Sequence, residues 1–131
     1  MKPARMLANI VGPMLFVQVI LGGSSVLLGL DIIYHLVWGL LAFVGLVATT
    51  LLGARDFGRG SNMVKVGIAA ILVFVLQGAL GFVAFGSDVV VVVHLANAFI
   101  LGILVTYFII FADAADMATA KMGAMGQSPS P

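Results

Sequence analysis

Four long apolar stretches run through the chain, at residues 9–30, 32–53, 63–85 and 89–112. Each is close to the ~20 residues that an α-helix needs to cross ~30 Å of hydrocarbon. None of them alternates apolar and polar residues, as the strands of a transmembrane β-barrel do. The pattern predicts an all-α integral membrane protein. It is expected to be a four-helix bundle made of two tandem helical hairpins, within one domain of residues 1–125.

Composition supports a membrane protein. Hydrophobic residues make up 63% of the chain and charged residues 8%, whereas a soluble domain is about half apolar and a quarter charged. The first stretch follows Lys2 and Arg5, as in a signal peptide, but it is longer than a typical apolar region of such a peptide. We therefore expect it to be retained. Residues 126–131, rich in Ser and Pro, are expected to be a disordered tail.

Basic residues flank only some of the apolar stretches. They lie before the first stretch, between the second and third, and after the fourth: Lys2, Arg5, Arg55, Arg59, Lys65 and Lys121. The other two turns carry none. The positive-inside rule then predicts that both termini are cytoplasmic in a multi-pass protein of the cell membrane.

The five acidic residues are all aspartates and lie at the predicted helix ends or in loops. Asp31 and Asp88 stand where the second and fourth helices begin, so each is expected to be an N-cap that accepts backbone N–H groups. Asp113, Asp116 and Lys121 are expected to continue the fourth helix beyond the membrane.

A short pattern of residues occurs twice along the chain. The matched positions are Gln18, Leu21, Gly22, His35 and Leu36 in the first copy and Gln77, Leu80, Gly81, His94 and Leu95 in the second. All five pairs have the same separation as Gln18 and Gln77, which we call the repeat offset. The chain is therefore interpreted as two copies of a helical hairpin, about residues 9–53 and 67–112. Each copy supplies one imidazole at an equivalent position.

The two histidines are predicted to lie at similar depth, about 6 and 9 Å along parallel helices from their starts. Diagonal helices of a bundle are on the order of 11–14 Å apart, given ~8–10 Å between neighbours, which leaves room for a metal. Zinc or copper normally needs further protein ligands, and the chain has neither Cys nor Glu. A heme needs only two axial ligands. Bis-histidine heme between His35 and His94 is the favoured prediction.

Other residues of the pattern allow two interpretations. Gly39 and Ala98 follow the histidines by about one helical turn and would let a flat macrocycle approach, but small residues in membrane helices also serve helix packing. Gln18 and Gln77 are expected to bond between helices or to a polar edge of a ligand. Asn97 would orient a ring or bridge helices. A histidine near the membrane interface can itself be structural.

The two Gln-x-x-Leu-Gly segments, each followed at the same spacing by a histidine, resemble the heme A synthase family. The resemblance covers residues ~9 to ~112 and one four-helix half of that family. It implies that His35 and His94 are axial ligands and that Gln18, Gln77, Gly22 and Gly81 line or support the pocket. It further implies heme b or heme O/A as cofactor and oxidation of the C8 methyl of heme O to the formyl of heme A.

Membrane lipid is an expected partner of so apolar a chain. The same resemblance implies further partners: a heme O synthase or a respiratory oxidase, and a homodimer that restores eight helices. The chain also departs from the family. Asp31, the candidate catalytic acid, lies one turn before His35 rather than beside it, Leu36 replaces a common arginine, and the outer cysteine pair is missing.

These departures keep alternatives open. The first is a non-enzymatic b-type cytochrome or a heme-handling subunit of a respiratory complex. The second is a small transporter without cofactor, which is disfavoured because no aspartate lies in the middle of a predicted helix. No nucleic-acid-binding patch is present.

Overall fold

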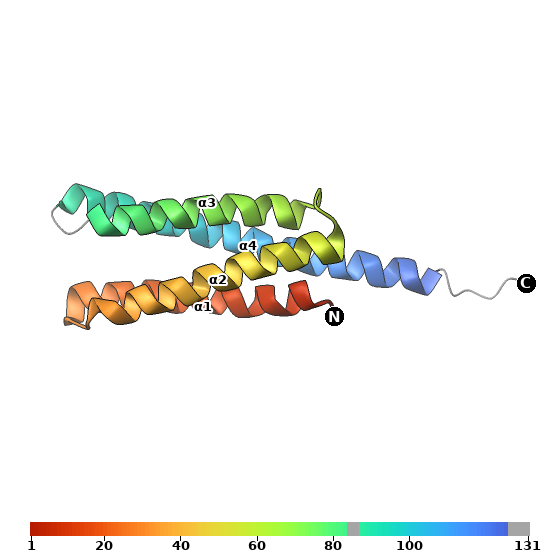
Figure 1. Cartoon of the computed structure of the whole chain (residues 1–131), viewed down its shortest axis with the longest axis horizontal. Helices are drawn as coiled ribbons and strands as arrows, with labels where there is room; N and C mark the ends of the chain where they lie inside the picture. Colours follow the sequence, from red (N-terminus) through yellow and green to blue (C-terminus); the bar gives the residue numbers. More distant parts are fainter. Residues whose placement is uncertain (84–86, 126–131) are drawn as a thin grey trace, which may run out of the picture.

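The computed structural model describes residues 1–83 and 87–125. Over these residues the chain forms four α-helices and no strand: α1 Pro3–Leu28, α2 Ile32–Phe57, α3 Asn62–Val83 and α4 Asp88–Met125 (Figure 1). Each helix is long and apolar enough to cross a membrane. The prediction of an all-α chain with four helices long and apolar enough to span a membrane is confirmed. The expected tail, residues 126–131, lies outside the described residues.

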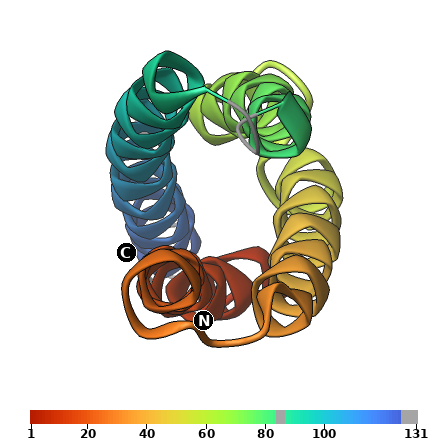
Figure 2. The ribbon, with the colours of Figure 1, turned by 90° about the vertical axis from the view of Figure 1, so that its left-hand side faces the viewer.

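The helices form a ring of sequence neighbours. α1 packs along α2 and α3 along α4, and the two hairpins meet where α1 contacts α4 and α2 contacts α3. A view along the bundle shows this ring, with α2 and α4 on one diagonal (Figure 2). Tandem hairpins therefore place the two histidine-bearing helices opposite each other, as their order in the chain predicts.

The buried core lies in the half of the bundle that holds the N-terminus of α1 and the connection between α2 and α3. All four helices contribute apolar side chains to it: Ala4, Ala8, Val11, Leu15, Ala42, Leu46, Met63, Val64, Ala70, Leu101, Val105, Phe108 and Ala112. Small residues allow close approach here. A Cβ added to Gly67 would lie 2.8 Å from the Phe108 ring, so α3 and α4 pack tightly at this point.

The buried positions recur at the same repeat offset as the sequence pattern. Those of α1 recur in α3: Ala4, Ala8 and Val11 match Met63, Gly67 and Ala70. Those of α2 recur in α4, where Ala42 and Leu46 match Leu101 and Val105. The internal repeat therefore extends from a few motif residues to the packing register of the bundle.

The opposite half, which we call the hairpin end, comprises residues 16–38, 71–83 and 87–96. None of these residues is fully buried. Here the α1–α2 hairpin lies apart from the α3–α4 hairpin (Figures 1 and 2). The contacts that bury side chains in all four helices together therefore lie in the other half of the bundle.

Helix ends follow local capping rules. α1 ends before Gly29, which adopts a left-handed conformation with φ of 70°, a conformation that glycine takes without a steric cost. Asp31 is the N-cap of α2 and accepts the N–H of Ile33 at 2.9 Å, as expected. The same expectation for Asp88 is wrong. Ser87 caps α4 through the Val90 N–H at 3.5 Å, and Asp88 lies in the first turn, where its charge favours the helix dipole.

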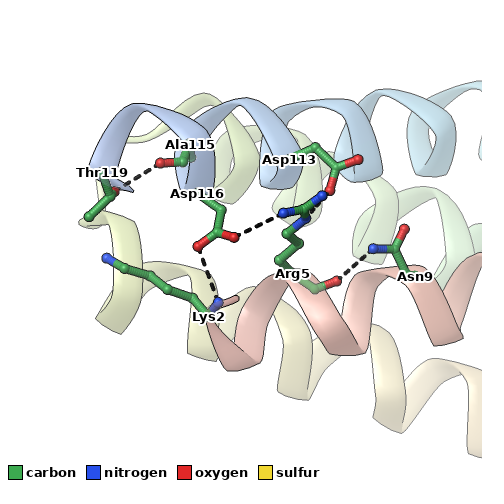
Figure 3. Close-up of polar contacts among 7 residues, drawn as sticks. All are labelled: Lys2, Arg5, Asn9, Asp113, Ala115, Asp116 and Thr119. Carbon is green, nitrogen blue, oxygen red and sulfur yellow. Dashed lines mark hydrogen bonds and ion pairs between the residues drawn. The ribbon is translucent and has the colours of Figure 1, made fainter. Parts of the chain in front are cut away.

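α4 continues well past the apolar stretch at 89–112, as Asp113, Asp116 and Lys121 predict. Its 38 residues correspond to about 57 Å. Arg5 of α1 binds Asp113 and, at 3.1 Å, Asp116, which also accepts the backbone N–H of Lys2 (Figure 3). These ion pairs fix the start of α1 against the extension of α4.

Candidate functional site

His35, in the first turns of α2, contacts one residue of α1 through both ring nitrogens. Its Nδ1 lies 3.0 Å from the backbone oxygen of Gln18, and its Nε2 lies 3.3 Å from the side-chain nitrogen of the same residue. A carbonyl oxygen only accepts and an amide nitrogen only donates. The hydrogen-bond network thus assigns the proton to Nδ1 and leaves Nε2 as the acceptor.

His94, in α4, has a different set of partners. Its Nε2 lies 2.9 Å from the side-chain nitrogen of Gln77 in α3, while its Nδ1 is buried and has no partner within the described residues. The oxygen of Gln77 accepts from Asn97 at 2.7 Å, and Asn97 also donates to the backbone oxygen of Val73 at 3.1 Å. Asn97 therefore fixes the orientation of the Gln77 amide, and it bridges helices as one of its two predicted roles.

The contacts of the two hairpins are equivalent at the repeat offset. Gln18–His35 corresponds to Gln77–His94, and Trp38 corresponds to Asn97. The indole N–H of Trp38 donates to the backbone oxygen of Met14 at 2.7 Å, as Asn97 donates to that of Val73. An indole has one N–H, so it cannot also serve the Gln18 side chain. The Gln18 Oε1 is accordingly buried without a partner among the described residues.

Sequence reasoning did not single out Trp38 as a polar partner. The signal was nevertheless present, because Trp38 and Asn97 are also separated by the repeat offset and hold the same position after their histidines. Given the repeat, a residue at this position is expected to donate a hydrogen bond to the preceding helix.

The glycines of the pattern make room for the polar side chains. A Cβ on Gly22 would lie 2.8 Å from Cε1 of His35, and a Cβ on Gly81 would lie 3.3 Å from Cε1 of His94. A Cβ on Gly39 would lie 2.6 Å from the side-chain nitrogen of Gln18. The space over Gly39 thus holds Gln18. Ala98, its counterpart in α4, is half-buried. These contacts support the packing interpretation of the small residues.

The two imidazoles share the hairpin end. Both are half-buried. Asp31 is the acid nearest to His35 in the sequence, but its carboxylate is exposed and accepts the N–H of Ile33. The candidate catalytic acid is therefore engaged in capping α2.

A test of fit for a metal starts from the ring nitrogens. A histidine that ligates a metal usually donates its other ring N–H to a carbonyl or carboxylate. His35 has this arrangement, with Nδ1–H on the Gln18 carbonyl and Nε2 in a long contact. His94 has its Nε2 held by Gln77, so Gln77 must turn away before that nitrogen can ligate. Gln18 must likewise leave its 3.3 Å contact with Nε2 of His35. Each imidazole would then present a free Nε2, the nitrogen that an axial heme ligand uses.

A site built from protein ligands alone fits less well. Across residues 1–83 and 87–125, no three or more His, Cys, Asp or Glu side chains gather as metal ligands do. No protein-family model, no characterised protein and no solved structure matches the chain. Function is accordingly argued from the residues at the hairpin end.

Proposed function

We propose that the chain is a membrane heme-binding protein in which His35 and His94 supply the two axial ligands between the hairpins. The observation that carries the proposal is the anchored His35 ring, whose Nδ1 lies 3.0 Å from the Gln18 carbonyl and whose Nε2 is thereby turned into the acceptor nitrogen. A bound heme would supply one-electron redox chemistry.

The residues of this chain have separate roles in that proposal. The Gln18 carbonyl holds the His35 tautomer, and Gly22 gives the ring its place against α1. Gln77, whose side-chain oxygen accepts from Asn97, holds His94. Each hairpin supplies one of the two histidines, so a ligand held by both would bridge the hairpins.

Two activities are compatible with such a site. Electron transfer or heme handling, as in a b-type cytochrome, is favoured by the capping role of Asp31, because that leaves no acid assigned to proton transfer at the histidines. A compact heme A synthase is the second candidate, and it rests on the resemblance of the Gln, Gly and His pattern. In that case the chain would act as a homodimer, with a heme O synthase or a respiratory oxidase as partner.

Orientation follows from charge. Lys2, Arg5, Arg55, Arg59 and Lys65 lie at the end of the bundle opposite to the hairpin end, and Lys121 lies on the extension of α4. This distribution supports cytoplasmic termini in the cell membrane, with the histidines in the outer leaflet.

The test is the absorption spectrum of the purified protein after reconstitution with heme. We expect a low-spin spectrum in the wild type and its loss, or conversion to high spin, in His35→Ala and in His94→Ala. Tyr34→Phe is the matched control, because Tyr34 is exposed beside His35. A colourless wild type, or spectra unchanged in both histidine variants, would contradict the proposal.

Heme analysis separates the two activities. Protein produced together with a heme O synthase is extracted and its heme is identified by mass. Unaltered heme supports the cytochrome, and hydroxylated or formyl heme supports the synthase. Asp31→Asn is the informative variant, since asparagine is as good an N-cap as aspartate but is no acid. If Asp31 acts chemically, this variant binds heme and does not convert it.

A further inference from the structure

A groove lies away from the histidines, at the contact of α2 with α3. Near the α2–α3 connection it has a volume of about 420 Å³ and is walled by apolar side chains such as Ala54, Val64 and Ile68, and Arg59 of the connection also lines it. It continues along α2 into a shallower apolar pocket that reaches Phe43, and Leu51 lines both parts.

The groove offers one charge and little other polarity. Thr50 also lines it, but its hydroxyl donates to the Leu46 carbonyl at 2.8 Å, so it has no proton left to donate to a phosphate. Arg59 is exposed, and among the described residues it forms no ion pair. The nearby Arg55 differs, because it binds Asp56 at 2.9 Å and does not line the groove.

The length of the groove matches one leaflet of a membrane. Ala54 and Phe43 lie about three helical turns apart along α2, or about 16 Å at ~1.5 Å per residue. The hydrocarbon of one leaflet is about 15 Å thick, half of ~30 Å. A chain that lies along the groove would thus run from the membrane surface at Arg59 to the middle of the bilayer.

We propose that this groove binds an anionic phospholipid, with an acyl chain along the α2–α3 contact and the phosphate against Arg59. An apolar channel of one-leaflet length with a cation at headgroup depth, unpaired among the described residues, complements this class of molecule in both shape and charge. Basic residues between membrane helices at the same depth bind such headgroups in general. The site is independent of the histidines and of any heme.

The experiment is native mass spectrometry of the full-length protein released from detergent after titration with phosphatidylglycerol or phosphatidylcholine of identical acyl chains. We expect retained phosphatidylglycerol to exceed phosphatidylcholine, and Arg59→Gln to weaken phosphatidylglycerol binding about fivefold, the effect of one basic residue at a membrane surface. Arg55→Gln is the matched control and should bind as the wild type does.

Two further arms sharpen the test. Ala54→Phe fills the groove and should reduce retention of both lipids, while circular dichroism checks that the helices persist. Equal binding of the two lipids by the wild type, or equal losses in Arg59→Gln and Arg55→Gln, would overturn the proposal. A wild-type dimer that retains no lipid would overturn it too, because a second copy would then cover the groove.

Discussion

The two hairpins each pack a histidine against the preceding helix, but they hold it with different hydrogen bonds. Each sets a histidine against a glutamine of the preceding helix, with a glycine beneath the ring. In the first hairpin the ring is tied to the Gln18 backbone and the Gln18 side-chain oxygen lacks a donor among the described residues. In the second, Asn97 fixes the Gln77 side chain and the ring Nδ1 lacks a partner there. Gln, Gly and His are common to both hairpins. The residue at the Trp38 or Asn97 position differs, and only Asn97 donates a hydrogen bond to the glutamine side chain.

This difference makes the two histidines unequal as ligands. His35 keeps its orienting hydrogen bond when a metal takes Nε2, because that bond uses a main-chain oxygen. His94 must first give up a 2.9 Å contact with an amide that a second residue holds in place. The proposed heme would therefore displace only the longer 3.3 Å contact of Gln18 at His35, and occupancy of the second axial position would depend on Gln77.

The largest expected difference comes from the third residue of each network. Asn97→Leu leaves the buried Gln77 oxygen without a donor, and we expect the free energy of unfolding to fall by about 1–2 kcal/mol. Trp38→Phe removes only the indole bond to the Met14 carbonyl and keeps most of the ring. Its loss should be about 0.6 kcal/mol, the mean for hydrogen bonds between membrane helices.

The measurement is unfolding in mixed detergent micelles with increasing sodium dodecyl sulfate, followed by far-ultraviolet circular dichroism. Equal losses in the two variants would contradict the assignment of a fixed side chain in the second hairpin and a free one in the first.

The glycines beneath the rings give the next comparison. Gly22→Ala places a methyl 2.8 Å from the His35 ring, whereas Gly81→Ala places one 3.3 Å from the His94 ring. The first must displace its imidazole, at about 1 kcal/mol, and the second needs a shift of a few tenths of an ångström. The same detergent unfolding series measures both. Gly23→Ala is the control, since nothing lies within 4 Å of that position, and a larger loss in Gly81→Ala than in Gly22→Ala would refute the ranking.

The smallest effect concerns ligand affinity and rests on the heme proposal. Gln77→Ala frees Nε2 of His94, so heme should bind about three- to tenfold more tightly, as follows from releasing one interhelical hydrogen bond of about 0.6–1.4 kcal/mol. Gln18→Ala keeps the backbone anchor of His35 and should change affinity less. Heme titrations followed by absorption decide this. Weaker binding in Gln77→Ala would mean that this glutamine supports the pocket directly, as the family resemblance implies.

The number and order of the helices could be predicted from the sequence, because a helix that crosses a membrane needs a long apolar stretch. The helix limits could not. α1 begins at Pro3, before the stretch at 9–30, and α2 runs to Phe57, past the stretch at 32–53. Hydropathy marks what crosses hydrocarbon, whereas a helix continues until a cap or a glycine ends it. Ser87 and Asp88 are adjacent and both are good N-cap residues, so the residue types alone do not show at which of them α4 begins.

Part of the candidate site could also be predicted, because the repeat is visible in the sequence. The repeat matches each glutamine and histidine to their counterparts, and the structure brings both Gln–His pairs into contact. Trp38 was missed as a hydrogen-bond donor although it matches Asn97 at the repeat offset, since an aromatic residue in a membrane helix is first interpreted as apolar surface. The repeat could not give the tautomer of His35, which depends on a backbone oxygen of another helix.

The buried side chains are confined to one half of the bundle, so the helices are held together there and their other ends extend beyond it. The packed half, which ends at Leu15 in α1, is the pivot, and the hairpin tips are lever arms that extend about 20 Å beyond it, at ~1.5 Å per residue from Leu15 to Leu28. A tilt of about 5° at the pivot moves a tip by about 2 Å over that arm. A small change of helix tilt in the packed half is therefore amplified at the hairpin end, where the two imidazoles lie.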